Sequence, residues 1–321
     1  MGEGLATRFY PNMKKDTPHS PLDQLAVEEP LEIRLEYWAQ GELQRRSVSI
    51  TMRTPGNDCE LAAGFLFTEG IIQGPDDIKQ IRLCGPQPKG QDFQNIVRVE
   101  LQPGVKVNTS TMERNFYTTS SCGICGKTSI EALKVSNRFG GKIKHLTSLR
   151  VKGDLLLGLP DLMKSEQQIF QQTGGCHASG LFDERGTLIC LREDVGRHNA
   201  LDKVVGWALM KGYLPLHHCF VLVSGRASFE LMQKASMGGI PLMAAIGAPS
   251  SLAVQVAKEL GMTLVGFLNN RGFKIYHDPG RIQARQNSKS RGENGKKIQR
   301  HEGPVKTPVG NSHRRSPKRQ N

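Results

Sequence analysis

Three short, wholly apolar segments in the C-terminal half of the chain constrain the fold more than any other feature. They occupy residues 219–223, 241–246 and 263–267. Residues 228–236 and 250–259, which separate them, each begin with a serine that can cap a helix. Continuous apolar strands that alternate with helices are typical of a parallel sheet covered on both faces. The sequence therefore predicts an α/β fold for this part of the chain.

The loops that follow these strands are the expected ligand site. Open α/β sheets bind ligands beyond the carboxyl ends of their strands, and the loops here are rich in small residues, hydroxyls and amides. Ser228 and Ser250 lie at predicted helix starts, where backbone N–H groups favour a phosphate. Arg226 and Arg271 can bind phosphate oxygens in bidentate fashion. An anionic, nucleotide-like ligand is one interpretation, and ordinary tight turns with surface arginines are the other.

The N-terminal half is predicted to be rich in strands. Residues 31–37 and 46–50 alternate apolar with polar or charged side chains and predict a hairpin, while 78–83 and 95–101 predict two more strands. A helix should begin near residues 57–60 and end at Gly70. Further helices are expected over residues 161–172 and 199–211, with a short hairpin between them around residues 184–186.

Two polar clusters lie in the loops before these last elements. Cys176 and His177 follow a double glycine, and His177 can be either a catalytic histidine or a structural one. Residues 192–199 place six polar side chains in eight positions. Either they take part in a functional site, or they form a salt-bridge and capping network in which Asp194 or Asn199 caps the following helix.

A C-x-x-C motif, Cys122-Gly-Ile-Cys125, carries the clearest chemistry. Glycines and serines surround it, and Thr128 to Glu131 read as a capping box that starts a helix directly afterwards. The positive end of this helix and the nearby Lys127 both favour the thiolate, which is the species that attacks sulfur. The motif is therefore predicted to perform sulfur chemistry on an exposed loop.

Three uses of such a pair stay open from spacing alone. A structural zinc site needs two more ligands, and the remaining five cysteines show no second close pair. A thioredoxin-like redox pair needs a β-α-β context that is only half met. The third use is a nucleophile that carries sulfur as a persulfide and passes it on by thiol exchange.

Charge and composition set the outer limits. Of the net charge of +13, residues 281–321 contribute +10, from 12 Lys/Arg against 2 Asp/Glu. This tail has almost no large apolar residues and is predicted to be disordered, as are residues 1–25. No signal peptide and no apolar run of membrane-spanning length is visible, so a cytoplasmic protein without membrane contact is expected. Nucleic-acid binding by the tail is not favoured, because no aromatic residue or motif accompanies the charge.

Several long motifs occur in an order that resembles the family of sulfur carrier (sulfurtransferase) proteins needed to activate formate dehydrogenases. The likeness covers roughly residues 28–278. The matching segments are Met52–Gly56 with Glu60-Leu61, Gly64–Gly70, Arg114–Tyr117 leading into Ser120–Lys127, Thr173–Gly175 with His177-Ala178, Arg192–Asp202, Ser224–Glu230, Ala248–Ser250 and Gly266-Phe267.

The resemblance implies a three-layer fold like that of the cytidine deaminases, with a smaller β-rich N-terminal part. The expected parts are residues 26–120 for the β-rich subdomain and 121–280 for the α/β domain with the C-x-x-C loop. Deaminase chemistry itself is not expected. Ser121 replaces the proline of the zinc motif, and no His-x-Glu or Cys-x-Glu triplet precedes Cys122. No permanently bound metal or cofactor is expected.

The resemblance also implies roles for residues. Cys122 would carry the persulfide, loaded by a cysteine desulfurase, and Cys125 is a possible second thiol. The sulfur would pass to the bis-guanine-dinucleotide molybdenum or tungsten cofactor before its insertion into formate dehydrogenase, and a homodimer is expected. The cofactor-contacting segment maps to Phe267-Leu268-Asn269-Asn270-Arg271-Gly272, which joins Ser224, Gly225 and Arg226 as the predicted ligand site. Asn269-Asn270 stand where the family usually has Arg-Gly. The alternatives are a cofactor-binding chaperone without thiol chemistry and a C-x-x-C redox protein.

Overall fold

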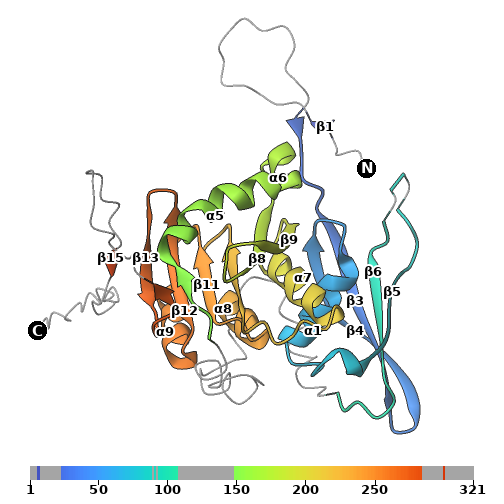
Figure 1. Ribbon diagram of the computed structural model, residues 1–321. Coiled ribbons are helices and arrows are strands. Elements are labelled where there is room, and N and C mark those ends of the chain that lie inside the picture. The colour runs from blue at the N-terminus through green and yellow to red at the C-terminus, as the bar shows by residue number, and fades with distance from the viewer. Residues whose placement is uncertain are drawn as a thin grey trace, which may run out of the picture.

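The computed structural model describes residues 23–88, 90–91, 93–107 and 148–283, together with the backbone of two short strands at residues 6–7 and 299–300. The C-x-x-C motif and the expected helix after it lie outside these residues. A seven-stranded sheet, a four-stranded sheet and the helices packed against them form most of the described fold, and two short two-stranded sheets, β1-β2 and β14-β7, complete it (Figure 1). No helix in the described ranges is both long and apolar enough to cross a bilayer.

The larger sheet has seven strands in the order β15-β13-β12-β11-β10-β8-β9. Strands β10, β11 and β12 are parallel, as their apolar sequences predicted. Strand β8 runs antiparallel to β10 and β9, and β13 runs antiparallel to β12 but parallel to β15. The bounds are β8 (His177–Asp183), β9 (Leu188–Asp194), β10 (Cys219–Val223), β11 (Leu242–Ala245), β12 (Thr263–Asn269), β13 (Gly272–His277) and β15 (Gln299–Arg300).

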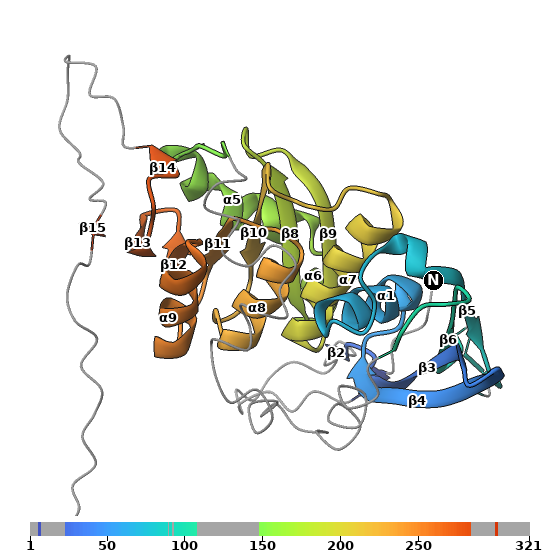
Figure 2. The same cartoon turned by 90° about the horizontal axis from the view of Figure 1, so that it is seen from below.

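Helices cover both faces of this sheet. Along β10, Val221 and Val223 belong to one buried cluster, and Phe220 and Leu222 to another, because successive side chains point to opposite faces. Figure 2 shows α7, α8 and α9 on the first face and α5 on the second. The expected three-layer α/β arrangement is confirmed. The helices are α5 (Gly153–Glu166), α6 (Gln168–Thr173), α7 (Arg197–Met210), α8 (Phe229–Met237) and α9 (Ser251–Leu260).

The expected helix over residues 161–172 is wrong in its bounds. The structure has two helices, and the first starts at Gly153, eight residues earlier. It ends because Gln167 leaves helical geometry, with ψ at 85°, and α6 begins after it. Leu156 and Leu159 of α5 are buried in the second cluster, and this packing outweighs the poor helix propensity of the proline at position 160.

The smaller sheet has four strands in the order β4-β3-β6-β5. Its strands are β3 (Glu29–Ala39), β4 (Glu42–Arg53), β5 (Ile78–Cys84) and β6 (Ile96–Leu101). The β3–β4 hairpin turns at Gln40 and Gly41, which both have positive φ, as a tight two-residue hairpin turn requires. Helix α1 (Asp58–Thr68) lies between this sheet and α7. The short elements are β1 (Ala6–Thr7), β2 (Asp23–Gln24), η1 (Pro75–Asp77), β7 (Val151–Lys152) and β14 (Ile282–Gln283).

Helices α1 and α7 cross at two glycines, and this crossing joins the two sheets. A Cβ atom built on Gly64 would collide with the carbonyl oxygen of Asp202 in α7. A Cβ atom built on Gly206 would collide with the carbonyl oxygen of Glu60 in α1. The two backbones are therefore in direct contact, and only glycine fits at either position.

Candidate functional site

The carboxyl ends of the parallel strands gather most of the predicted site residues at one edge of the large sheet. Strand β8 is antiparallel to β10, with Ser179 opposite Val223, so its first residue, His177, lies at this same edge. Helices α7, α8 and α9 also begin here. Ser228 and Ser250 cap α8 and α9 as expected, since their hydroxyls accept hydrogen bonds from the N–H groups of Leu231 and Ala253.

The loop after β10 is packed closely against its neighbours. The Ser224 hydroxyl accepts a hydrogen bond of 2.9 Å from the N–H of Ala178, and the Gly225 carbonyl accepts one of 3.0 Å from the N–H of Gly247. A Cβ atom on Gly225 would lie 3.4 Å from Nδ1 of His177. The Arg226 side chain is exposed. Ser224 and Gly225 thus shape the edge, while Arg226 extends from it into solvent.

The predicted cofactor segment forms the turn between β12 and β13. Phe267 has φ of 53° and is 43 % exposed, whereas Leu268 is fully buried. The Asn269 side chain closes the turn: its amide donates to the Phe267 carbonyl at 3.0 Å, and its oxygen accepts from the N–H of Arg271 at 2.8 Å. Lys274 Nζ lies 5.1 Å from the centre of the Phe267 ring. The Phe267 ring and the Lys274 amine are therefore presented together.

Strand β13 was not expected from the sequence, and it is the element that places Lys274 beside this turn. In this strand the apolar residues Phe273 and Ile275 alternate with the charged Lys274. Phe273 and Ile275 are buried in the second cluster. That alternation is a strand signal. A lysine is therefore present beside Phe267, the first residue of the predicted cofactor segment.

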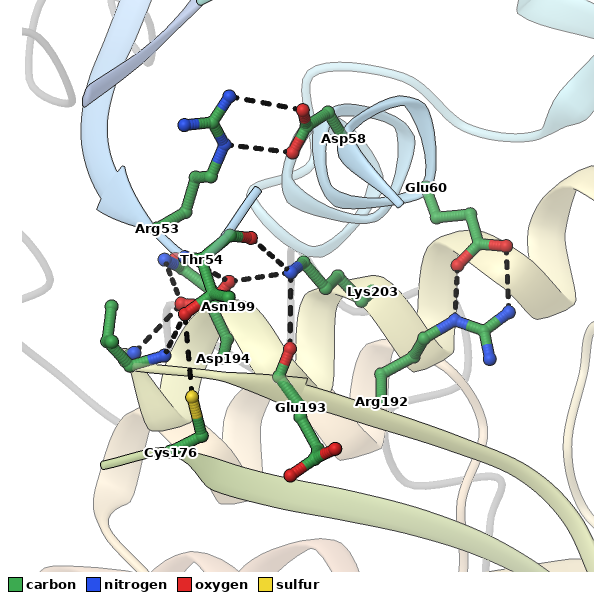
Figure 3. Close-up of polar contacts among 12 residues, drawn as sticks. Arg53, Thr54, Asp58, Glu60, Cys176, Arg192, Glu193, Asp194, Asn199 and Lys203 are labelled. Atoms are coloured by element: carbon green, nitrogen blue, oxygen red, sulfur yellow. Dashed lines mark hydrogen bonds and ion pairs between the residues drawn. The ribbon is translucent and has the colours of Figure 1, made fainter. Parts of the chain in front are cut away.

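Residues 192–199 form a polar network with the loop after β4 (Figure 3). Asp194 lies 2.7 Å from Lys203, and both side chains are almost fully buried. Asp194 also accepts hydrogen bonds from the N–H groups of Thr54 and Gly196 and from the Asn199 amide. Lys203 donates to the carbonyl oxygens of Thr54 and Glu193. The salt-bridge interpretation of this cluster is confirmed for these residues.

The capping expectation for α7 needs correction. The residue at the N-cap is Gly196, not Asp194 or Asn199, and no side chain caps this helix. Asp194 is held by Lys203 instead, and the Asn199 amide reaches back to the carbonyl oxygen of Met52 at 2.8 Å. Both candidate caps are therefore used to fasten β4 to α7.

Two bidentate ion pairs extend the network. Arg53 binds both carboxylate oxygens of Asp58 in a buried pair, and Arg192 binds both oxygens of Glu60 at 2.6 and 2.9 Å. The Glu193 carboxylate accepts hydrogen bonds from the N–H groups of Ile169 and Phe170 in α6. A pocket of about 400 Å³ lies beside β9, and Arg192, Glu193 and Lys203 of this network are among the residues that line it.

Most of the described cysteines are poor nucleophiles. Burial raises the pKa of Cys190 to about 12 and that of Cys219 to about 11. Burial also raises the pKa of Cys59 and of Cys176, whose sulfur lies 3.5 Å from the Thr54 hydroxyl. Among the residues described, no group of three or more His, Cys, Asp or Glu side chains is placed to hold a metal ion.

Comparison with known proteins agrees with this architecture. A crystal structure from Desulfotalea psychrophila, described as a formate dehydrogenase accessory protein, superposes with a TM-score of 0.59 at 26% identity, covering 81% of this chain and 91% of that one. A protein of Streptomyces avermitilis named sulfur carrier protein FdhD is 50% identical over 264 residues, which are 82% of this chain and 90% of the relative. A protein of the same name from Mycobacterium tuberculosis is 44% identical over 286 residues, 88% of this chain and 100% of the relative.

The family comparison covers nearly all of the described body. The chain matches the FdhD/NarQ family over residues 26–283, which include the smaller sheet, the larger sheet except β15, the polar network and the turn at Phe267. The curated relatives align over most of their own length, so the match is not confined to one part. The chain therefore belongs to the FdhD/NarQ family.

Proposed function

We propose that this chain is a sulfur carrier that serves formate dehydrogenase, with Cys122 as the residue that bears the sulfur. Membership of the family and the names of relatives at 44–50% identity support the sulfur carrier role. Cys122 lies outside the described residues, so its assignment rests on its sequence motif. The properties of the other thiols add support, because burial raises the pKa of four of the five described cysteines.

The loading step is a thiol exchange. The Cys122 thiolate attacks the outer sulfur of a persulfide on a cysteine desulfurase, a new sulfur–sulfur bond forms, and the donor cysteine leaves as a thiolate. The exchange is balanced, because one persulfide is consumed and one is made. A thiolate is the reactive species, and a cysteine with a pKa near 11 or 12, such as Cys219 or Cys190, supplies very little of it at neutral pH.

The receiving ligand is proposed to be the guanine-dinucleotide form of the molybdenum or tungsten cofactor, bound at the carboxyl edge. The exposed Phe267 ring is a flat apolar surface on which a guanine base can stack. Lys274 lies beside that ring, and Arg226 and Arg271 are exposed at the same edge. Ser224 and Gly225 form the floor of this edge, through the backbone contacts that they make with β8 and with Gly247.

The test compares Cys122→Ala with Cys219→Ala, a matched change at a thiol that is not expected to react. Each protein is incubated with a cysteine desulfurase and cysteine, and its peptides are examined by mass spectrometry for one added sulfur atom. Wild type and Cys219→Ala should gain sulfur on the peptide that contains Cys122, and Cys122→Ala should support no formate dehydrogenase activity in cells that lack the natural protein.

The outcomes separate the alternatives. Full activity of Cys122→Ala would show a cofactor chaperone without thiol chemistry. A Cys122–Cys125 disulfide with no added sulfur in the wild type would show a redox pair. Cys125→Ala then defines the second thiol: loss of delivery with sulfur still loaded on Cys122 places Cys125 after the loading step.

A further inference from the structure

Several polar groups at the carboxyl edge are not used by the network. The side-chain atoms Ser179 Oγ, Arg197 Nε and His198 Nε2 are all buried and make no hydrogen bond among the described residues. Ser179 itself is only 1 % exposed. Leaving a buried polar group without a partner costs about 1–3 kcal/mol, so such a group in a folded protein calls for a specific reason.

Arg197 and Ser179, together with His177, lie at the backbone of Gly225 or at the end of β10 that precedes it. A Cβ atom built on Gly225 would lie 3.4 Å from Nδ1 of His177 and 3.9 Å from Cδ of Arg197, so these two side chains flank the glycine. Ser179 is two residues beyond His177 on β8, and alternate side chains of a strand share a face. Its partner on β10, Val223, directly precedes the loop that contains Gly225.

The start of α7 faces the same point. Arg197 is the first residue of this 14-residue helix, and no side chain caps it. The N–H groups of the first helical turn lack partners within the helix and carry the positive end of the helix dipole. The first turn of α7 therefore adds backbone donors to the side-chain donors beside Gly225.

The charges nearby leave this place positive. Asp194 is neutralised by Lys203 at 2.7 Å, and Glu230 has the His198 ring 3.9 Å away. Arg197 makes no ion pair with a described carboxylate. Burial lowers the pKa of His177, and the positive charges of Arg197 and His198 lower it further. His177 is therefore a neutral ring at pH 7, able to donate one hydrogen bond.

We propose that Arg197, Ser179, His177 and the N-terminus of α7 form a subsite for a phosphate group. This inference rests on the proposed function and refines it. The guanine base of the ligand stacks on Phe267, and the oxygen atoms of a phosphate group bind beside Gly225. A guanidinium donates two parallel bonds to such an anion, and the hydroxyl, the imidazole and the helix N–H groups supply the others.

The subsite differs from the arginines that the sequence suggested. Arg226 and Arg271 are both exposed, where a charge contact is weakened by water and salt. Arg197 is partly buried. Its Nε atom makes no hydrogen bond among the described residues, so ligand binding would not have to break one there. Arg197 is therefore expected to contribute more to phosphate affinity than either exposed arginine.

The experiment measures binding of GDP, inorganic pyrophosphate and guanosine by calorimetry to the full chain. For Arg197→Gln, the affinities for GDP and pyrophosphate should fall by about tenfold or more, equal to about 1.4 kcal/mol, and the affinity for guanosine should not change. Ser179→Ala should lower the affinities for GDP and pyrophosphate by a smaller factor. The control is Arg185→Gln, which removes the same charge from the exposed β8–β9 turn at the opposite end of these strands and should bind all three probes as the wild type does.

Three results would overturn the subsite. They are equal affinity of the wild type for GDP and guanosine, unchanged pyrophosphate binding in a folded Arg197→Gln protein, and an equal loss in Arg185→Gln. Pyrophosphate binding without any gain for GDP would show a site for a free anion and not for a nucleotide. If Arg197→Gln unfolds, Arg197→Lys keeps the charge without the planar fork, and it should bind pyrophosphate more weakly than the wild type.

A measurement of sulfur loading on Cys122 distinguishes a failure of the phosphate subsite from a failure of the sulfur carrier role. Arg197→Gln should still gain sulfur on Cys122 when it is incubated with the desulfurase, because loading needs no phosphate. Loss of phosphate binding with loading intact supports the subsite within a sulfur carrier. Phosphate binding at Arg197 in a protein that never accepts sulfur would retain the subsite and refute the carrier role.

Discussion

At the scale of single residues, Glu230 and His198 show how the carboxyl edge holds its charges. Nε2 of His198 lies 3.9 Å from Oε2 of Glu230. This histidine is the main cause that lowers the pKa of Glu230 to about 2 from the usual 4.5, and the N–H of Glu230 in the first turn of α8 and the Ser228 hydroxyl lower it further. The folded state thus favours the Glu230 carboxylate.

The lowered pKa of Glu230 predicts how stability depends on pH. A carboxyl group whose pKa is lower in the folded state stabilises the fold above its unfolded pKa, and this contribution disappears as the pH falls through the folded value. The window here runs from about pH 4.5 down to about pH 2. Glu230→Gln should therefore be less stable than wild type at pH 7, and the difference should vanish toward pH 2. Urea denaturation at several pH values measures it.

The control for this experiment is Glu184→Gln, in the exposed turn between β8 and β9. It removes the same charge where no cation lies within ion-pairing distance among the described residues, so its stability should follow the wild type across the range. A constant difference between Glu230→Gln and wild type from pH 7 to pH 2 would show that the carboxylate charge has no part in the effect.

At the scale of elements, the α1–α7 crossing depends on two glycines. A methyl group at Gly64 or Gly206 meets the backbone carbonyl oxygen of the other helix, and backbone cannot move aside as a flexible side chain can. Gly206→Ala should therefore force the helices apart and lower the free energy of unfolding by about 1–3 kcal/mol or more. Thermal or urea unfolding of the purified variants measures this.

Gly158→Ala is the matched control for the crossing. Gly158 is also inside a helix, α5, but nothing lies within 4 Å of its added methyl group. Alanine should be tolerated there and should raise the free energy of unfolding by about 0.5–1 kcal/mol, because glycine is a poor helix former. If Gly206→Ala were as stable as Gly158→Ala, close backbone contact would not be what joins α1 to α7.

Elements with a clear period or cap were predictable from the sequence, and the others were not. The apolar runs of β10 to β12 and the serine caps of α8 and α9 were assigned correctly because each is a local signal. The start of α5 was missed because Gly153, Gly158 and Pro160 disfavour a helix, and only packing of its leucines under the sheet decides the matter. Tertiary contacts outweigh propensity there.

The site shows the same division. The loops at the carboxyl edge followed from the strand pattern, but the roles within residues 192–199 did not. Asp194 and Arg197 lie three residues apart in one polar run, yet Asp194 is fully paired with Lys203 and Arg197 has a buried atom without a partner. A sequence shows which polar groups are present, and only the fold shows which of them remain available for a ligand.

At the scale of the whole molecule, the Asp194–Lys203 pair connects the two sheets. Lys203 in α7 holds the carbonyl oxygen of Thr54, which follows β4 of the small sheet, and Asp194 at the end of β9 accepts from the N–H of the same threonine. The two side chains are at most 1 % exposed. Because the pair and the helix crossing both join the two sheets, loss of packing in one sheet should also lower the stability of the other.

Removal of one partner of this pair should therefore destabilise the whole described body as one unit. Lys203→Met leaves the Asp194 carboxylate buried without its cation, which should cost about 3–5 kcal/mol. Adding Asp194→Asn removes that unpaired charge while keeping an acceptor for the Thr54 N–H, so the double variant should recover part of the loss. Urea unfolding followed by tryptophan fluorescence, from Trp38 on β3 and Trp207 on α7, and by circular dichroism should give one shared transition in each variant.

Two separate transitions in Lys203→Met would mean that the sheets fold independently. A loss below about 1 kcal/mol, the range of an exposed pair, would mean that water reaches Asp194 and that the pair does not connect the two sheets.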